Sequence, residues 1–147
     1  MAVPDKKLKV LFLCSANSCR SQMAEGWARA LKRESIEAHS AGIAASALNP
    51  LAARVMAEAG APIDSQRSKA VGDLPGLSFD FIVTVCAEAG AACPVFSGGG
   101  KVVHAPFDDP PRLAEGAGSE EEALAHYRRV RDEIRAFAER LPGALTG

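Results

Sequence analysis

The sequence predicts a single domain, spanning residues 1–147, with a three-layer α/β/α fold around a central, mostly parallel four-stranded sheet. Two observations predict this α/β fold. Apolar, strand-like runs alternate along the chain with amphipathic helical patterns, which indicates parallel strand pairs. Hydrophobic residues make up 48% of the chain, enough for one packed core without disulfides or a structural metal.

The first two elements flank a polar turn. Residues 10–13 (Val-Leu-Phe-Leu) form a continuous apolar run, typical of a strand that is buried on both faces. Beyond the turn, Met23, Trp27 and Leu31 recur at intervals of four residues. We therefore expect an amphipathic helix that begins near Ser21.

The middle of the chain adds two strands and a helix. A short run around residues 36–39 reads as a second strand, which ends at Ala41-Gly42. Asn49 and Pro50 supply an N-cap and a first helical residue, and Gly60 ends this second helix. Residues 79–85 (Phe-Asp-Phe-Ile-Val-Thr-Val) carry the clearest strand pattern of all.

The last part of the chain predicts a strand over residues 101–105, a turn over 108–111 and a long helix. Ser119 and Glu122 form a capping-box pair before this helix, and its apolar stripe ends at Pro142. Parallel sheets bind ligands beyond the carboxyl ends of their strands, so we expect the functional site in the turns that follow them.

Charge and hydropathy exclude several kinds of partner. Seventeen basic and eighteen acidic residues give a formal net charge of -1, which leaves no basic footprint for nucleic acid and no polybasic patch for a membrane. No apolar stretch approaches the roughly 20 residues that cross a bilayer, and the first apolar run is too short for a signal peptide. We expect a cytoplasmic protein that acts as a monomer.

Four cysteines stand out: Cys14, Cys19, Cys86 and Cys93. In a reducing cytosol, cysteines are more typical of catalysis or metal binding than of structural disulfides. The spacings within the first pair and within the second do not match those of structural zinc sites. The sequence therefore predicts no metal, and no cofactor is expected.

The first two cysteines lie in a turn that reads Cys, five residues, Arg, Ser, between a buried strand and a helix start. A tight loop of small residues can turn its backbone N–H groups inward, and the helix start adds donors and the positive end of its dipole. This arrangement predicts a cradle for a tetrahedral oxyanion. Its residues are Ser15, Ala16, Asn17, Ser18, Cys19, Arg20 and Ser21.

The residue types in the loop suit nucleophilic chemistry. The same field is expected to lower the pKa of Cys14 below the free value of about 8.5, which makes it a nucleophile. Arg20 presents a fork of donors that matches two oxygens of an oxyanion. We expect Ser21 to donate a hydrogen bond to the Cys14 sulfur, and Asn17 to tolerate a left-handed backbone.

The loop and the residues after it, Gln22 to Trp27, resemble the low-molecular-weight protein tyrosine phosphatase family, and more narrowly its thioredoxin-coupled arsenate reductases. The similarity runs from about Lys9 to the last helix and implies the family's phosphatase-like fold. Its further motifs are Ser40-Ala41-Gly42, Asn49-Pro50, Val83-Thr84-Val85-Cys86, Phe107-Asp108-Asp109-Pro110 and Val130-Arg131-Asp132-Glu133-Ile134.

Two features favour the reductase over the phosphatase. The phosphatases generally place a tyrosine after the Asp-Pro motif, whereas Pro111 and Arg112 follow it here. Hydrolysis needs one cysteine, whereas reduction of As(V) to As(III) needs two electrons, which Cys86 and Cys93 can supply. These two cysteines are seven positions apart, about 10.5 Å along a helix, so a disulfide between them requires local unfolding.

The resemblance implies a role for each of four residues. Cys14 attacks arsenate, and Asp109 protonates the departing oxygen. Cys86 then attacks the Cys14 sulfur, which releases arsenite and leaves a disulfide. Cys93 next attacks Cys86, and thioredoxin reduces the resulting bond. Cys19 has no step.

Alternatives stay open at this point. A phosphomonoester phosphatase would use the same loop, and phosphate or sulfate would compete with arsenate there. A non-enzymatic thiol redox sensor would use the same cysteines. Glutaredoxin or a small thiol could replace thioredoxin as the reductant.

Some members of the family bind potassium beside the loop, through residues that match Asn17, Glu25 and Ser40 together with an aspartate. Lys69 stands at the position of that aspartate here. Because a lysine ammonium can replace the charge of the cation, we expect no potassium requirement.

Overall fold

The computed structural model describes residues 7–74, 78–86 and 100–146 of the chain. Four strands form one parallel sheet in the order β2-β1-β3-β4. Their bounds are β1 Leu8–Cys14, β2 Ile36–Gly42, β3 Phe81–Thr84 and β4 Lys101–His104. The predicted α/β fold with a central four-stranded sheet is confirmed, and every strand pair is parallel.

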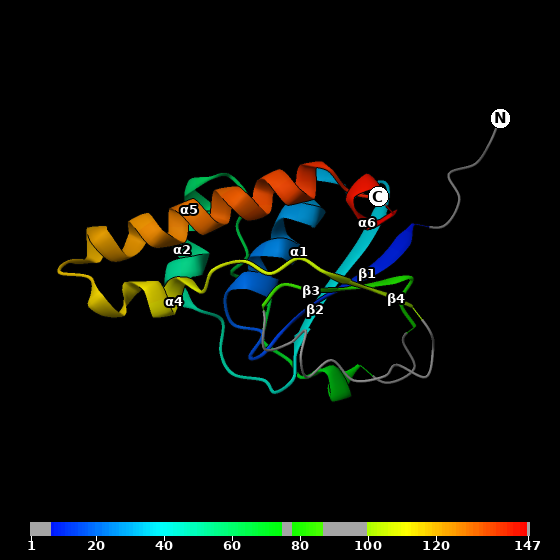
Figure 1. Ribbon diagram of the computed structural model, residues 1–147, viewed down its shortest axis with the longest axis horizontal. Coiled ribbons are helices and arrows are strands. Elements are labelled where there is room, and N and C mark those ends of the chain that lie inside the picture. The colour runs from blue at the N-terminus through cyan, green and yellow to red at the C-terminus, as the bar shows by residue number, and fades with distance from the viewer. Residues whose placement is uncertain (1–6, 75–77, 87–99, 147) are drawn as a thin grey trace.

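Helices pack on this sheet, and Figure 1 shows α1, α2 and α5 together on one of its faces with η1 on the other. The α-helices are α1 Arg20–Leu31, α2 Pro50–Glu58, α4 Pro110–Leu113, α5 Glu120–Glu139 and α6 Gly143–Thr146, and the short 3₁₀ helices are η1 Val71–Asp73 and η2 Ala114–Gly116. The three helices predicted from periodicity correspond to α1, α2 and α5. None of the described helices is long and apolar enough to cross a membrane.

The third strand is shorter than the predicted range 79–85 and spans Phe81–Thr84. Just before it, the Asp80 N–H donates to the Lys9 carbonyl, and the Asp80 carboxylate accepts from the Lys9 N–H, both at 2.8 Å. The second strand begins at Ile36 and ends at Gly42, as predicted, and it pairs with β1 along the whole length of that strand.

The central strand β1 is the most deeply buried element. Val10, Leu11, Phe12 and Leu13 are each at most 1% exposed, which confirms the prediction that this strand is covered on both faces. Strands pair with it on either side, and α1 packs against both β1 and β2. The loop that follows β1 therefore begins from a rigid base.

The strand register brings three distant segments to one edge of the sheet. Leu13 of β1 lies opposite Thr84 of β3, and the Val85 N–H donates to the Leu13 carbonyl at 2.9 Å. Beyond β4, the Phe107 N–H donates to the Val85 carbonyl at 3.0 Å. The residues just after β1, β3 and β4 are therefore neighbours.

Gly42, at the end of β2, leaves room for the loop after β1. A Cβ atom at this position would lie 2.5 Å from the Ala44 carbonyl oxygen and 2.7 Å from the Asn17 backbone nitrogen. Both neighbours are backbone atoms, which cannot rotate away as a side chain can. Only a glycine fits between them without a shift of the loop.

We expect Gly42→Ala to lower the free energy of unfolding by about 1–3 kcal/mol, because the added methyl group overpacks the loop backbone. It should also weaken phosphate binding, since the loop must move. Gly116→Ala is the matched control, because a Cβ atom there meets nothing within 4 Å. Urea unfolding and calorimetric phosphate titration test this, and equal behaviour of the two variants would contradict it.

Candidate active site

The loop over residues 15–19 joins the end of β1 to the start of α1. Cys14, the last residue of β1, is buried, with 4% of its surface exposed. No side chain caps the start of α1 at Cys19. The first backbone N–H groups of α1 therefore remain available as donors beside the loop. Such free donors at a helix start suit the binding of an anion.

Asn17 holds the loop from inside. It is fully buried, and its φ of +50° is the left-handed backbone that the sequence predicted. Its amide nitrogen donates to the hydroxyls of Ser21 and Ser40 at 2.9 and 3.0 Å. Its amide oxygen accepts from the backbone of Lys69 at 2.9 Å and from the side chain of Gln22 at 3.1 Å. These four bonds fix one conformation of the loop.

Three further side chains brace the loop from outside. The Gln22 amide donates to the Asn17 carbonyl at 3.0 Å, and Gln66 in turn donates to the Gln22 amide oxygen at 2.8 Å. The Ser68 hydroxyl donates to the Ala16 carbonyl at 3.0 Å. The sequence analysis missed Gln66 and Ser68, since they belong to an irregular segment with no motif of its own.

A buried carboxylate lies behind the loop. Glu25 is 3% exposed and accepts a hydrogen bond from Ser40 at 2.5 Å. Two cations compensate its charge: Arg29 at 2.7 Å and the Lys69 ammonium at 3.9 Å. Burial lowers the pKa of Lys69, and the nearby carboxylate of Glu25 opposes that shift. Lys69 thus stands beside Glu25, as the family resemblance implied.

Two cysteines meet at the site, Cys14 at the end of β1 and Cys86 just after β3. The thiols of Cys14 and Cys86 are hydrogen-bonded, and both residues are at most 4% exposed. This bond and burial raise the pKa of Cys14, whereas the Arg20 guanidinium and the Ser15 N–H lower it. The expectation of a lowered pKa is therefore wrong, because it did not include the second thiol.

Ser21 also differs from the prediction. Its hydroxyl accepts from the Asn17 amide, and the described contacts include no hydrogen bond from it to the Cys14 sulfur. No pattern in the sequence indicates that the Asn17 amide nitrogen lies 2.9 Å from this hydroxyl. Ser21 therefore stabilises the conformation of the loop through Asn17.

The predicted anion clamp and the predicted acid lie together. Arg20 is 6% exposed and donates to the Phe107 carbonyl at 3.0 Å. Its guanidinium lies 3.5 Å from the Asp109 carboxylate. The turn predicted over 108–111 is the start of α4, with Asp109 as the N-cap and Pro110 as the first helical residue.

An open cleft of about 730 Å³ adjoins this pair. Its lining residues are Arg20, Pro106, Phe107, Asp108, Asp109, Arg112 and Leu113. Phe107 packs edge-on against Phe137 of α5, with ring centroids 6.0 Å apart, which anchors this wall of the cleft. The carboxylate of Asp109, with its side chain 38% exposed, can reach a ligand from solvent.

The other two cysteines contribute differently. Cys19 is buried, and its pKa is raised by burial and by the nearby Asp109, so it is a poor nucleophile. Cys93 lies outside the described residues, as does the segment between it and Cys86. Within the described parts of the chain, no group of three histidine, cysteine or acidic side chains could hold a metal ion.

A strand that ends in a cysteine, an anion loop, an arginine clamp and an aspartate across a cleft define an enzyme of the phosphatase-like class. The chain belongs to the low molecular weight phosphotyrosine protein phosphatase family, whose model matches residues 9–146. The family predicted from the sequence is thereby confirmed, and the chain is an enzyme of this family.

Within the family, several of the similar proteins are named arsenate reductases. One from Bacillus subtilis (strain 168) is 44% identical over 125 residues, which cover 85% of this chain and 88% of that protein. One from Halalkalibacterium halodurans is 42% identical over 137 residues, which cover 90% of this chain and 96% of that protein. A solved arsenate reductase from Archaeoglobus fulgidus has a TM-score of 0.70 and 31% identity, covering 91% of this chain and 98% of its own.

Exchange of sodium for potassium is expected to leave the melting temperature and the phosphate affinity unchanged, because Lys69 already provides a cation beside Glu25. Thermal melts in sodium, potassium and choline chloride at equal ionic strength measure this. A rise in Tm that is specific to potassium would contradict it.

Removal of the second thiol is expected to lower the pKa of Cys14, because the hydrogen bond to Cys86 is the largest cause that raises it. In Cys86→Ala, alkylation of Cys14 by iodoacetamide should therefore reach half its maximal rate at a lower pH than in the wild type. Mass spectrometry of the Cys14 peptide measures the rate. Cys19→Ala is the control, and the idea fails if all three proteins share one midpoint.

Proposed function

We propose that the protein reduces arsenate to arsenite. The observation that carries this proposal is the hydrogen-bonded pair of Cys14 and Cys86 beside Arg20. A hydrolase of this family needs a single nucleophilic sulfur, whereas a two-electron reduction needs a second sulfur within reach of the first. The similarity to proteins named arsenate reductase supports the same substrate.

The first step binds and activates the oxyanion. Arsenate lies in the loop, where backbone N–H groups and the Arg20 guanidinium hold its oxygens. Loss of one proton from the Cys14–Cys86 pair leaves one thiolate charge that the two sulfurs share. When Cys14 carries that charge, it attacks the arsenic atom, and Asp109 protonates the oxygen that departs as water.

The second step transfers the electrons. Cys86 loses its proton and attacks the Cys14 sulfur, and a disulfide forms between the two residues. The sulfur–arsenic bond breaks, and its electron pair stays on arsenic, which leaves as As(III) in arsenite. Two thiols have then been oxidised and one arsenic atom reduced by two electrons, so the step balances.

The third step restores the nucleophile. Cys93 attacks Cys86, which frees Cys14 and moves the disulfide to Cys86 and Cys93. Thioredoxin then reduces the exposed disulfide, and glutaredoxin or a small thiol is the alternative reductant. A monomer in the cytoplasm suits this partner, and the relay needs no cofactor.

Phosphomonoester hydrolysis is the second candidate. Cys14, Arg20 and Asp109 are the groups that such a hydrolysis needs, and the adjoining cleft has room for an organic leaving group. We expect only weak activity of this kind, because Pro111 and Arg112 stand where the phosphatases generally place a tyrosine as a wall for the substrate ring.

A comparison of Cys93→Ser with Cys86→Ser tests the relay. Cys93→Ser should release about one arsenite per protein and then stop, because the Cys14–Cys86 disulfide persists. Cys86→Ser should release none, because the second sulfur is missing. Arsenite is counted by chromatography with thioredoxin, thioredoxin reductase and NADPH present. Repeated turnover by Cys93→Ser would contradict the proposed relay.

A further inference from the structure

Arg112 lines the same cleft as Arg20 and Asp109 but has no part in the chemistry described above. It lies in α4, three residues after the N-cap Asp109. The residue is exposed, and it lines the cleft together with Arg20. An anion in this cleft is therefore attracted by both guanidinium groups.

The charge of Arg112 is not neutralised by a nearby carboxylate. Asp108 is paired with Arg129 of α5 at 3.0 Å, and Asp109 with Arg20 at 3.5 Å. Among the described residues, the side chain of Arg112 has neither an ion pair nor a hydrogen bond. The acidic residues of the cleft therefore already have partners, and Arg112 is a cation that faces solvent.

The arginines of α5 differ in this respect. Each of them lies within 3.5 Å of a carboxylate: Arg128, Arg129, Arg131 and Arg135. Such pairs cover a surface with balanced charge. An arginine without a pair at the mouth of an oxyanion site is an exception to that pattern.

We propose that Arg112 is a capture residue, which attracts tetrahedral oxyanions into the cleft and passes them to the loop and Arg20. This inference rests on the proposed function, because it assigns the residue to an oxyanion substrate. Uncompensated charge at a cleft mouth raises the local concentration of counter-ions and their rate of entry. Arg112 therefore acts on KM and on the association rate, whereas Arg20 also acts on kcat.

Phosphate binding to the reduced wild-type protein tests this without turnover. In Arg112→Ala, the phosphate affinity should fall by about threefold to tenfold at low ionic strength. The difference should shrink at high salt, because screening acts strongly on exposed charges. Arg112→Lys should restore most of the affinity, and Arg112→Glu should lower it further. With arsenate as substrate, the same variants should change KM and leave kcat close to the wild-type value.

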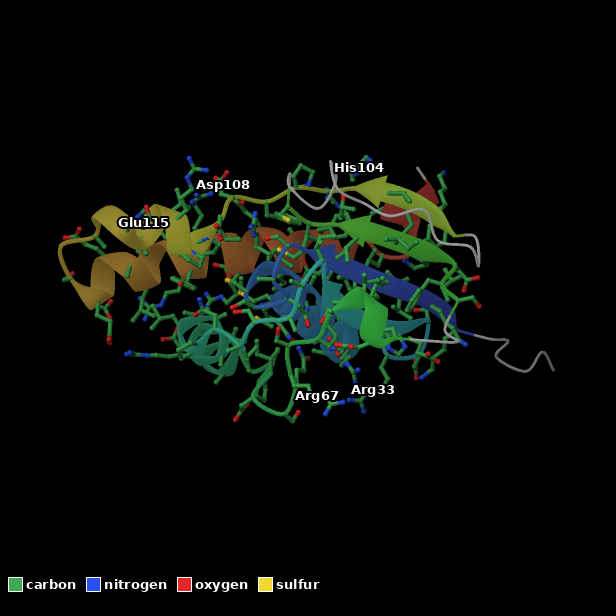
Figure 2. All side chains as sticks on the ribbon, turned by 90° about the horizontal axis from the view of Figure 1, so that it is seen from below. Arg33, Arg67, His104, Asp108 and Glu115 are labelled. Carbon is green, nitrogen blue, oxygen red and sulfur yellow. The ribbon has the colours of Figure 1, made fainter. Side chains whose placement is uncertain are left out.

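Arg33→Ala is the matched control. It removes the same charge from an exposed arginine without an ion pair. Asp108 is one of the residues that line the cleft. Figure 2 shows Arg33 on the opposite side of the molecule from Asp108. Arg33→Ala should bind phosphate as the wild type does.

Each other outcome overturns the proposal. Equal affinities of Arg112→Ala and Arg33→Ala would assign the effect to net charge. A loss that high salt does not reduce, or that lysine does not restore, would show a structural role. A wild type that binds no phosphate would also refute capture, whereas intact phosphate capture without arsenite production counts against the proposed function alone.

Discussion

The parallel pairing of β1 with β3 is the constraint on which the site depends. It sets Leu13 opposite Thr84, so the residues that follow the two strands leave the sheet at the same edge. Cys14 and Cys86, which are 72 positions apart in the chain, become hydrogen-bonded there. A slip by one residue would turn each side chain to the other face of the sheet and separate the two sulfurs.

The anion loop depends in turn on a buried polar network. Asn17 has a backbone conformation that few residues adopt, and its bonds to Ser21 and Ser40 stabilise it. Glu25 continues the network behind the loop, with two cations beside it. Buried polar groups are costly unless they are all paired, so this network favours one shape of the loop over alternatives.

Local charge explains how a chain with a net charge of -1 can hold an oxyanion. Arg20 is buried and oriented by the Phe107 carbonyl and the Asp109 carboxylate, so it is already in place before a ligand arrives. The second thiol beside Cys14 opposes this field, because it raises the pKa that Arg20 lowers. The reactivity of Cys14 is therefore a property of the pair of sulfurs and their shared proton.

The sequence by itself determined the strand and helix types and the place of the candidate anion loop, with Cys14 and Arg20 as its proposed nucleophile and clamp. Hydrophobic periodicity and short motifs depend on residues that are near one another in the chain, so they can be read without the fold. Asn17 is one such case, since its left-handed backbone follows from residue type and place in the turn. Only the tertiary structure decided that Ser21 bonds to Asn17, that Gln66 braces the loop, and that Cys86 changes the pKa of Cys14. Those contacts join segments that lie far apart in the chain. The strand register and the buried polar network bring these segments together, and no pattern within a single stretch of sequence indicates such contacts.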